Sequence, residues 1–548
     1  MKKNFKKLVA LSLVGAMFMG LAVGCGKKED KNNNTNPTPT TEANEGTTGE
    51  TGTYTDYSNG FEKEVTIQIP VYDRAFEGWN VTDNYYTKWI QSEFGAKYNV
   101  NVEFVAIGRS TEVTDYTVML AAGTAPDIIF HYDMPQALAY YGEGAVQKLD
   151  LKEIANYAPT YWSNLGSTIE QYGVVDNDNY FFFAERPEQD NWVTLIRQDW
   201  IEKVGKEMPT SLEEYNELLK AWKDAGLGNG GGTLIQNSFN YDYAFRNWPI
   251  DKDERALYSD LSVANFTTES TYKFLKNLNY QYNNGLIDPE FYLNTDDAST
   301  QADFVSGNSG VYSFYLSSSS TVIDNLLKND SNAKVAVLSP YAGTPEGNVP
   351  QGRAYWPFGM IMGINSTTTA EERAAIWMYL DWMSQPENLF FLQNGVEGQN
   401  YTLDESGLAV KVADFAGESK VSNNNNKDYW CLVVESAQYD DAELNYQSKI
   451  LNWSPKGYEY LVEDLIKYYD EVAEYRTPDP LYTVVLEKVA EYKSDLNDVW
   501  KELYVKTVMA KEADFDSVYE KAKQDFLDSG YQEILDEKTE AIANGSYN

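Results

Sequence analysis

The segment VMLAAGTAPDIIFHYD, residues 118–133, decides the fold of this chain. Residues 118–121 fit the last turns of a helix, because Gly123 is typical of the position just past a helix end. Pro126 then prevents the helix from resuming. The apolar run 128–130 that follows predicts a short strand buried on both faces.

Polar and aromatic side chains follow this strand at His131, Tyr132 and Asp133. In an open α/β sheet, ligands bind beyond the carboxyl ends of the strands. These three residues are therefore the first candidates for a binding site. An ordinary surface loop is the alternative explanation for each of them.

Strands and helices alternate on the N-terminal side of this segment. Residues 65–69 alternate as a half-buried strand that we expect to end at Pro70. Trp89, Ile90 and Phe94 line one face of a predicted helix, and residues 100–105 form a second strand. This succession predicts an α/β fold with a parallel sheet.

A second well-marked helix begins near residue 210. Thr210 and Glu213 have the spacing of a capping box, in which each side chain binds a backbone N–H group at the helix start. The apolar positions of the following turns fall on one helical face: Leu212, Tyr215, Leu218, Leu219 and Trp222. We therefore predict an amphipathic helix here, and amphipathic helices again from Leu481 to the end of the chain.

Several segments together resemble one family, the ABC-transporter extracellular solute-binding proteins of family 1. AAGTAPDII at 121–129 is similar to the family's sGxxPD segment, and TLIRQDWIEKVGKEMPTSLEEY at 194–215 resembles its iRxDWLdKlGlkxPtTldEw pattern. Residues 142–150, 301–312 and 394–401 resemble three further segments, although Asn400 stands where the family usually has histidine. The resemblance covers nearly all of residues 61–548.

The resemblance implies a fold and a division of the chain. The fold is the two-lobed α/β fold of type II periplasmic binding proteins such as maltose-binding protein, with a hinge and an interlobe cleft. We expect lobe 1 to comprise about 61–180 and 305–365, and lobe 2 about 181–304 and 366–548. The segment 301–312 resembles the family's return strand, which is expected to take the chain back to lobe 1. The length of 548 residues agrees with two large lobes.

The N-terminus has the pattern of a bacterial lipoprotein leader. Residues 1–24 combine a basic start with a short apolar stretch, and Leu21-Ala22-Val23-Gly24-Cys25 resembles a lipobox. Cleavage before Cys25 and lipidation of its sulfur would place the protein on the extracellular face of the cell membrane. A plain signal peptide is the alternative. Residues 25–60 are poor in large apolar residues and predict a disordered tether.

Composition narrows the choice of ligand. The formal charge of −39 argues against nucleic acid as a partner. The 13 tryptophans and 42 tyrosines suit sugar rings, whose faces carry C–H groups, although core packing explains many of them. The single histidine, His131, excludes a multi-histidine metal site.

Ten residues are candidate ligand contacts, chosen for their positions near predicted strand ends and in aromatic clusters. The stacking candidates are Trp79, Trp192, Tyr241, Trp248 and Trp356, and the candidates for hydroxyl contacts are Asp73, Asp133, Arg197, Arg353 and Glu397. Some related proteins carry a calcium loop after the helix that ends near residue 222. Here residues 224–233 lack most of the oxygen ligands, so we predict no calcium there and no cofactor.

The leading hypothesis is a monomeric binding protein that delivers an oligosaccharide to an ABC permease. A secreted glycoside hydrolase is the rival hypothesis. With 83 acidic residues, two carboxylates at the spacing that such an enzyme needs can always be found, so their presence is no evidence for catalysis. No nucleophile elbow or metal-ligand cluster supports an enzyme. A peptide-binding or sensor role is a third hypothesis.

Overall fold

The computed structural model describes most of the chain beyond residue 53, namely residues 54–74, 79–186, 191–228, 255–258, 263, 265–293, 297–344, 347–350, 352–412, 415–421, 423–436, 439, 441–478 and 481–547. The predicted leader and Cys25 lie outside these residues. The Tyr54 hydroxyl donates to Asp150 Oδ2 at 2.8 Å, and the Tyr57 ring stacks on Phe61 with centroids 4.1 Å apart. The prediction that the tether extends to residue 60 was therefore wrong, because residues 54–60 pack against folded structure.

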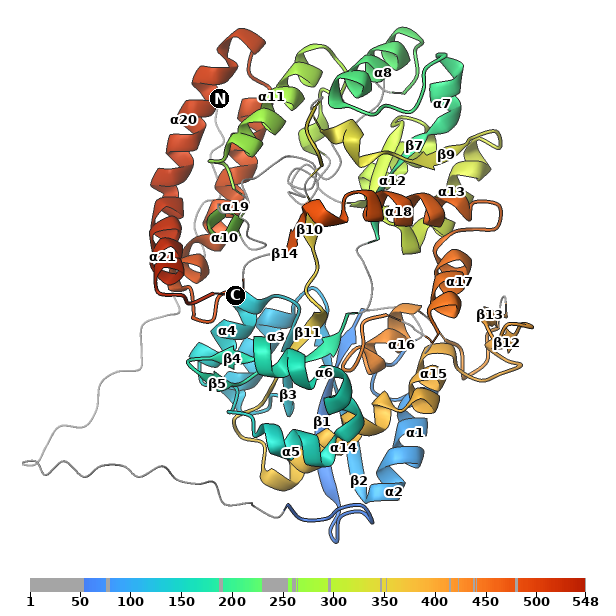
Figure 1. Cartoon of the computed structure of the whole chain (residues 1–548), viewed down its shortest axis with the longest axis vertical. Helices are drawn as coiled ribbons and strands as arrows, with labels where there is room; N and C mark the ends of the chain where they lie inside the picture. Colours follow the sequence, from blue (N-terminus) through green and yellow to red (C-terminus); the bar gives the residue numbers. More distant parts are fainter. Residues whose placement is uncertain are drawn as a thin grey trace, which may run out of the picture. The chain divides into compact units, whose positions relative to one another are not determined.

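Three strands that run in the same direction begin the fold (Figure 1). β1 (Val65–Asp73) and β2 (Val100–Gly108) pair in parallel along their whole length. β3 (Ile128–His131) lies beside β1, because Gln68 donates its backbone N–H to Asp127 Oδ2 and the Tyr72 and Phe130 rings are 4.6 Å apart. β1 passes through Pro70 rather than ending there, since the fixed φ of proline is compatible with extended backbone.

The segment that decides the fold behaves as its sequence predicts. α3 (Glu112–Ala122) ends at Gly123, which has φ 68° and whose N–H group bonds back to the last turn. All four residues of β3 are buried. β3 pairs antiparallel with β11 (Phe358–Ile364), which in turn pairs with β6 (Phe182–Glu185).

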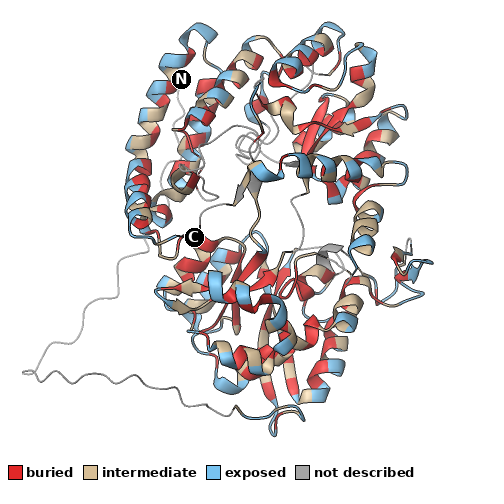
Figure 2. Ribbon diagram, in the orientation of Figure 1, coloured by how far each residue is buried: buried red, intermediate tan, exposed pale blue. Residues whose placement is uncertain are grey.

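Helices cover these strands and complete what we call the first core, a cluster of buried residues between Phe61 and Leu481 (Figure 2). Tyr86, Phe130, Phe182 and Trp377 are among its fully or almost fully buried members. The helices and helical turns around it are α1 (Tyr85–Ile90), a π-helical turn η1 (Gln91–Gly95), α2 (Ala96–Tyr98), α4 (Met134–Gly142), α5 (Leu151–Tyr157), α6 (Pro159–Tyr172), α14 (Ala370–Ser384), α15 (Pro386–Asn394) and α16 (Asn423–Trp430).

A second core surrounds the sheet in which β7 (Trp192–Arg197) lies between β8 (Val311–Tyr315) and β9 (Val335–Val337). Buried clusters lie on both faces of this sheet. The helices that contribute to them are α7 (Gln198–Lys203), α8 (Leu212–Asp224), α12 (Asp297–Ser306), α13 (Ser319–Asn329), α17 (Ala442–Trp453) and α18 (Tyr460–Glu471).

The start of α8 corrects one detail of the sequence prediction. Its apolar face is buried as predicted, but the N-cap is Ser211, whose hydroxyl accepts from Glu214 N. The Glu214 carboxylate accepts from the backbone and side chain of Thr210 at 2.8 and 2.9 Å. The capping pair is therefore one residue later than the predicted Thr210 and Glu213.

The C-terminal helices pack with α11 (Glu269–Asn283) around a third cluster, the C-terminal core. They are α19 (Glu487–Val508), α20 (Phe515–Phe526) and α21 (Gln532–Ala543), which confirms the predicted helical C-terminus. The Trp500 indole donates to Asn265 O at 3.2 Å, and the Tyr519 hydroxyl donates to Phe266 O at 2.9 Å.

The division of the chain between cores differs from the predicted lobes. β8 and β9, predicted for lobe 1, hydrogen-bond to β7 in the second core, with Trp192 paired to Tyr315. α14, predicted for lobe 2, buries Trp377 in the first core. The strand that returns the chain to the first core is therefore β11. Its wholly apolar pattern, which β8 lacks, suits a strand buried between β3 and β6.

Among the helices of the described residues, none is both long and apolar enough to cross a membrane.

Candidate functional site

The ends of β1, β2 and β3 bring several polar side chains to one edge of the first core. Asp73 is the last residue of β1 and pairs in register with Gly108, the last residue of β2. Arg109 follows β2 and donates its backbone N–H to Asp73 O at 3.1 Å. Because β3 runs alongside β1, His131 and Asp133 reach the same edge. We call this group of residues the strand-end site.

A buried carboxylate organises the strand-end site. Glu112, at the start of α3, accepts from His131 Nε2 at 2.7 Å and from Arg109 at 3.1 Å. His131 Nδ1 accepts from the backbone N–H of Asp133 at 2.9 Å, so the ring proton lies on Nε2. The lone histidine therefore has a structural task, which is to connect α3 to the end of β3.

An exposed guanidinium lies beside two tyrosine rings at this edge. The rings of Tyr72 and Tyr132 stack with centroids 6.2 Å apart, and the Arg109 guanidinium carbon lies 4.9 and 5.4 Å from them. The Arg109 side chain is 43% exposed. A planar cation next to aromatic faces can hydrogen-bond a ligand's oxygen atoms while the rings contact its C–H faces.

Two other arginines at this edge are fully engaged with carboxylates. Arg74, just beyond β1, forms a bidentate pair with Asp428 of α16 at 2.7 and 2.8 Å. Arg186, just beyond β6, donates to Glu435 at 2.6 Å. Their side chains are only 25% and 20% exposed. Arg109 is therefore the arginine of this group that is most available to a ligand.

Burial and charge shape the titration of these groups. Burial raises the pKa of Asp428, and the hydrogen bond from Arg74 only partly opposes it. Burial also raises the pKa of Tyr132, and the nearby charges of Glu435 and Asp428 add to the effect while Arg109 opposes it. Tyr132 thus lies within electrostatic reach of both arginine–carboxylate pairs.

Two of the predicted contact residues lie at the strand-end site, and a third packs against the first core. Asp73 is exposed, and Asp133 is the N-cap residue of α4 with a 46% exposed side chain. Trp79 is partly buried against the first core. The structure therefore brings Asp73 and Asp133 together, as expected for residues at the ends of neighbouring strands.

The other predicted contacts lie elsewhere. The Arg197 guanidinium is 3% exposed and binds both Asp199 and Asp330 at 2.7 Å. Two carboxylates of the second core therefore occupy its hydrogen-bonding groups. Trp192 packs on Tyr315, and Trp356 packs on Tyr172. Glu397 is exposed in the turn after α15. Tyr241, Trp248 and the Arg353 side chain lie outside the described residues.

Sequence reasoning missed the most informative members of the site. Arg109 follows β2 in the same way that Asp73 ends β1, so the rule that selected Asp73 could have selected Arg109 as well. Asp428 and Glu435 carried no comparable signal. They lie 354 and 249 residues from Arg74 and Arg186 in the sequence.

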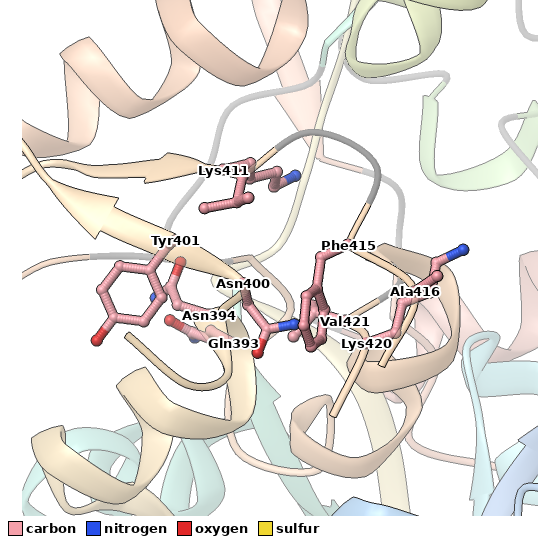
Figure 3. A pocket seen from close by; sticks show the side chains of 10 residues that line it. Gln393, Asn394, Asn400, Tyr401, Lys411, Phe415, Ala416, Lys420 and Val421 are labelled. Atoms are coloured by element: carbon pink, nitrogen blue, oxygen red, sulfur yellow. The ribbon is translucent and has the colours of Figure 1, made fainter. Parts of the chain in front are cut away.

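A separate cavity of about 380 Å³ lies between α15 and the hairpin of β12 (Tyr401–Leu403) and β13 (Ala409–Lys411). Figure 3 shows Asn400 and Phe415 among the side chains that line it. The Asn400 carboxamide is already engaged, since it accepts from Val396 N and donates to Ser419 O, each at 2.8 Å. Asn400 therefore fixes the loop around this cavity.

Within the described part of the chain, no group of three or more His, Cys, Asp or Glu side chains could hold a metal ion. Half of residues 224–233, for which we predicted no calcium, lie outside the described residues, namely 229–233. That prediction stays untested.

Replacing Glu112 with glutamine is expected to weaken the loss of stability on acidification. Burial acts to raise the pKa of Glu112, but the hydrogen bond from His131, with contributions from Tyr72 and Arg109, leaves this pKa below the ordinary value of 4.5. Such a group contributes stability above its unfolded-state pKa, and this stability is lost as the pH falls through its folded-state pKa. Urea unfolding at a series of pH values from about 6 down to about 3 measures the difference.

The control for this experiment is Glu143→Gln, which changes an exposed carboxyl just after α4. The wild type and the control should lose stability in parallel, and Glu112→Gln should lose less. Identical pH dependence in all three proteins would contradict the assignment.

Comparisons with known proteins bear on the family and the fold of this chain. A sequence profile of the family described as bacterial extracellular solute-binding protein matches residues 89–390. Lipoprotein LipO of Bacillus subtilis is 27% identical over 227 residues, which make up 38% of this chain and 44% of the relative. Polygalacturonan/rhamnogalacturonan-binding protein YtcQ of the same species is 22% identical over 328 residues, or 56% of this chain and 62% of the relative. The matches thus span less than two thirds of either relative.

A solved structure extends the comparison to almost the whole fold. The crystal structure of alginate-binding protein AlgQ2 without calcium ion superposes with a TM-score of 0.59 over 89% of this chain and 99% of that chain. The sequences are 17% identical, so the likeness concerns the fold alone. It confirms the predicted mixed α/β, two-lobed fold.

Proposed function

Because the chain belongs to the bacterial extracellular solute-binding protein family, we propose that it captures an oligosaccharide outside the cell and delivers it to an ABC permease. The observation that carries the proposal is the family match over residues 89–390, together with a relative named for binding polygalacturonan and rhamnogalacturonan. A solute-binding protein releases its ligand unchanged, so we propose binding without turnover.

The strand-end site supports an oligosaccharide ligand. Arg109 supplies an exposed guanidinium, and Asp73 and Asp133 supply exposed carboxylates that can accept hydrogen bonds from hydroxyl groups. Tyr132 supplies an aromatic ring beside Arg109 at the same edge. The guanidinium also suits a sugar carboxylate, because Arg binds carboxylates in a bidentate manner. Among ligand classes, an acidic or neutral oligosaccharide uses all of these groups.

Tyr241, Trp248 and Arg353 remain proposed contacts on sequence grounds alone. Arg197 is no longer proposed, since Asp199 and Asp330 already satisfy it. Trp192, Trp356 and Glu397 would contribute only if the ligand extends beyond the strand-end site.

We also propose that lipid at Cys25 holds the protein at the cell surface. A tether formed by the residues between Cys25 and Tyr54 would keep the folded part near its permease. Such a linkage raises the effective concentration at the permease without any new contact. The relative named Lipoprotein LipO supports this arrangement.

A thermal-shift screen of residues 26–548 tests the proposed function. The panel contains oligogalacturonides, rhamnogalacturonan fragments, neutral oligosaccharides, peptides and calcium chloride. A ligand that binds only the folded state raises the melting temperature, and an excess of about 100 times Kd adds about 2.7 kcal/mol of stability. We expect a shift with one class of oligosaccharide and recovery of that sugar intact.

Two results of the screen would contradict the proposal. A shift with peptides and with no glycan would favour a peptide-binding or sensor protein. Shortening of the bound oligosaccharide by the purified protein would favour a glycoside hydrolase.

A further inference from the structure

The cavity between α15 and the β12–β13 hairpin is distinct from the strand-end site, and we call it the hairpin cavity. Its described lining residues come from the end of α15 (393–394), from the hairpin and its flanks (between 400 and 412) and from the segment 415–421. None of them belongs to the strand-end site. The volume of about 380 Å³ falls within the range of about 300–1,000 Å³ that is typical of sites for small molecules.

Hydrogen bonds hold the walls of the hairpin cavity in place. Val412 donates its N–H to Asn400 O, and Asn400 Nδ2 donates to Ser419 O, each at 2.8 Å. The Tyr86 hydroxyl, from α1 in the first core, donates to the same Ser419 oxygen at 2.6 Å. The walls are therefore fixed before a ligand enters, and such preorganisation lowers the free-energy cost of binding.

A buried hydrogen-bond donor in this cavity has no acceptor. Gln393 is 8% exposed, and its Nε2 group has no hydrogen-bond partner among the described residues. The other two lining carboxamides are engaged, since Asn394 Nδ2 donates to Phe390 O at 3.1 Å and Asn400 Nδ2 donates to Ser419 O. An unpaired buried donor costs stability, so a ligand oxygen that accepts from Gln393 removes this cost on binding.

The charged residues that line the hairpin cavity are positive, although the chain as a whole is acidic. The described lining includes Lys411 and Lys420 and no Asp or Glu, in a chain with 83 acidic and 44 basic residues. The exposed Glu397, whose charge adds to burial in raising the pKa of Tyr401, is not among the lining residues. The lining therefore favours an anion.

The environment of Lys411 agrees with an anionic ligand. The residue as a whole is exposed, yet loss of water around its ammonium group lowers its pKa. A carboxylate bound next to Lys411 favours the charged form of the side chain and opposes this shift.

Apolar side chains complete the lining and narrow the class of anion. Val412, Phe415 and Val421 line the cavity together with the two lysines. Figure 3 shows Lys411 above Gln393 in this view, with Phe415 to their right. An aromatic ring packs against the C–H face of a sugar, whereas a small inorganic anion makes no use of it. The groups of this cavity therefore match a molecule with a carboxylate, hydroxyl groups and a C–H face.

We propose that the hairpin cavity is a further binding site, which takes one hydroxylated carboxylate of the size of a sugar acid. Lys411 and Lys420 bind its carboxylate, Gln393 Nε2 donates to one of its oxygen atoms, and Phe415 packs against its C–H face. The proposal rests on the cavity alone and does not depend on the oligosaccharide proposed for the strand-end site.

Ligand-observed NMR titrations of the purified protein with D-galacturonate test the proposal. The comparison probes are D-galactose, which has a hydroxymethyl group in place of the carboxylate, and acetate, which has the carboxylate but no ring. Galacturonate should bind about tenfold more tightly than either probe, since a hydrogen bond to a charged group changes affinity by at least this factor. Equal affinity for galactose, equal affinity for acetate, or no binding of galacturonate would overturn the proposal.

Two substitutions locate the binding. Lys411→Met and Gln393→Met should each weaken galacturonate binding by about tenfold. Lys152→Met, which removes an exposed lysine of α5, is the matched control and should bind as the wild type does. Unchanged affinity in both cavity variants would remove the sugar acid from the hairpin cavity. If Lys411→Met does not fold, Gln393→Met alone decides.

Gln393→Met also separates a role in binding from a role in stability. Because Nε2 has no acceptor among the described residues, its removal should leave the melting temperature of the ligand-free protein unchanged or raised. A protein of undiminished stability that binds galacturonate more weakly has lost a ligand contact. A lower melting temperature would show that Gln393 is needed for folding and would strike it from the site.

Arg109→Met distinguishes the hairpin cavity from the strand-end site, since Arg109 also suits a carboxylate. Galacturonate binding should persist in Arg109→Met and weaken in Lys411→Met. The opposite result would place the sugar acid at the strand-end site and overturn the proposal. If no oligosaccharide binds the wild type in the thermal-shift screen, the proposed function fails while the galacturonate titrations still judge the hairpin cavity.

Discussion

Asp428→Ala is expected to lower the free energy of unfolding by about 3 kcal/mol, because it leaves the partner of a buried ion pair uncompensated. The Asp428 side chain is 2% exposed and accepts two hydrogen bonds from Arg74 at 2.7 and 2.8 Å. Arg74 itself is 25% exposed, so water relieves only part of the loss. The midpoint and slope of urea unfolding measure the change.

Two further variants test whether Asp428→Ala loses stability because a buried ion pair is broken or because the net charge changes. Asp516→Ala removes a carboxylate that pairs with Lys276 at 3.0 Å on the surface, with side-chain exposures of 71% and 51%. It should cost much less stability than Asp428→Ala, because water and salt screen an exposed pair. The double variant Arg74→Met/Asp428→Leu should recover much of the loss, since an apolar pair can replace a buried ion pair. An Asp428→Ala protein as stable as the Asp516→Ala control would contradict the expectation.

Arg109→Met is expected to weaken oligosaccharide binding by about 10- to 100-fold. A hydrogen bond to a charged group contributes about 1.5–3 kcal/mol, and each 1.4 kcal/mol corresponds to a factor of ten in affinity. Arg109 is the most exposed of the three arginines at the strand-end site. Titration calorimetry with the oligosaccharide found in the thermal-shift screen measures the loss.

The charge of the ligand decides how the loss depends on salt. For an acidic oligosaccharide, wild-type affinity should fall with rising ionic strength more steeply than that of Arg109→Met, because salt screens exposed charges. Lys276→Ala removes one positive charge at a distant surface position and should bind as the wild type does. Unchanged affinity in a folded Arg109→Met protein would remove Arg109 from the site and weaken the case for the strand-end site as a whole.

Local sequence was sufficient to predict several elements of both cores. The helix stop at Gly123, the buried run in β3 and the apolar face of α8 all follow from backbone preferences and periodicity within short windows. The same reasoning placed Asp73 and Asp133 at the ends of neighbouring strands. It failed for the strands of the second core, since β8 could pair with any strand and its sequence does not specify β7.

Asp127 illustrates the difference between a motif and its cause. The sequence marks it only as part of a pattern that resembles a family segment. In the structure its carboxylate accepts from Gln68 N at 2.7 Å and from Thr368 Oγ1 at 2.8 Å, so it connects β1 to the turn after β11. The motif residue therefore stabilises the sheet and does not face the proposed ligand.

The sequence by itself determined the alternation of strands and helices, the family resemblance and the edge at which a ligand is expected. Only the tertiary structure decided which charged side chains form ion pairs with one another. With 83 acidic and 44 basic residues, the sequence does not reveal that Arg74 and Arg197 are paired and that Arg109 stays exposed. The physical reason is that ion pairing depends on distance in space, and the partners here lie up to 354 residues apart in the chain.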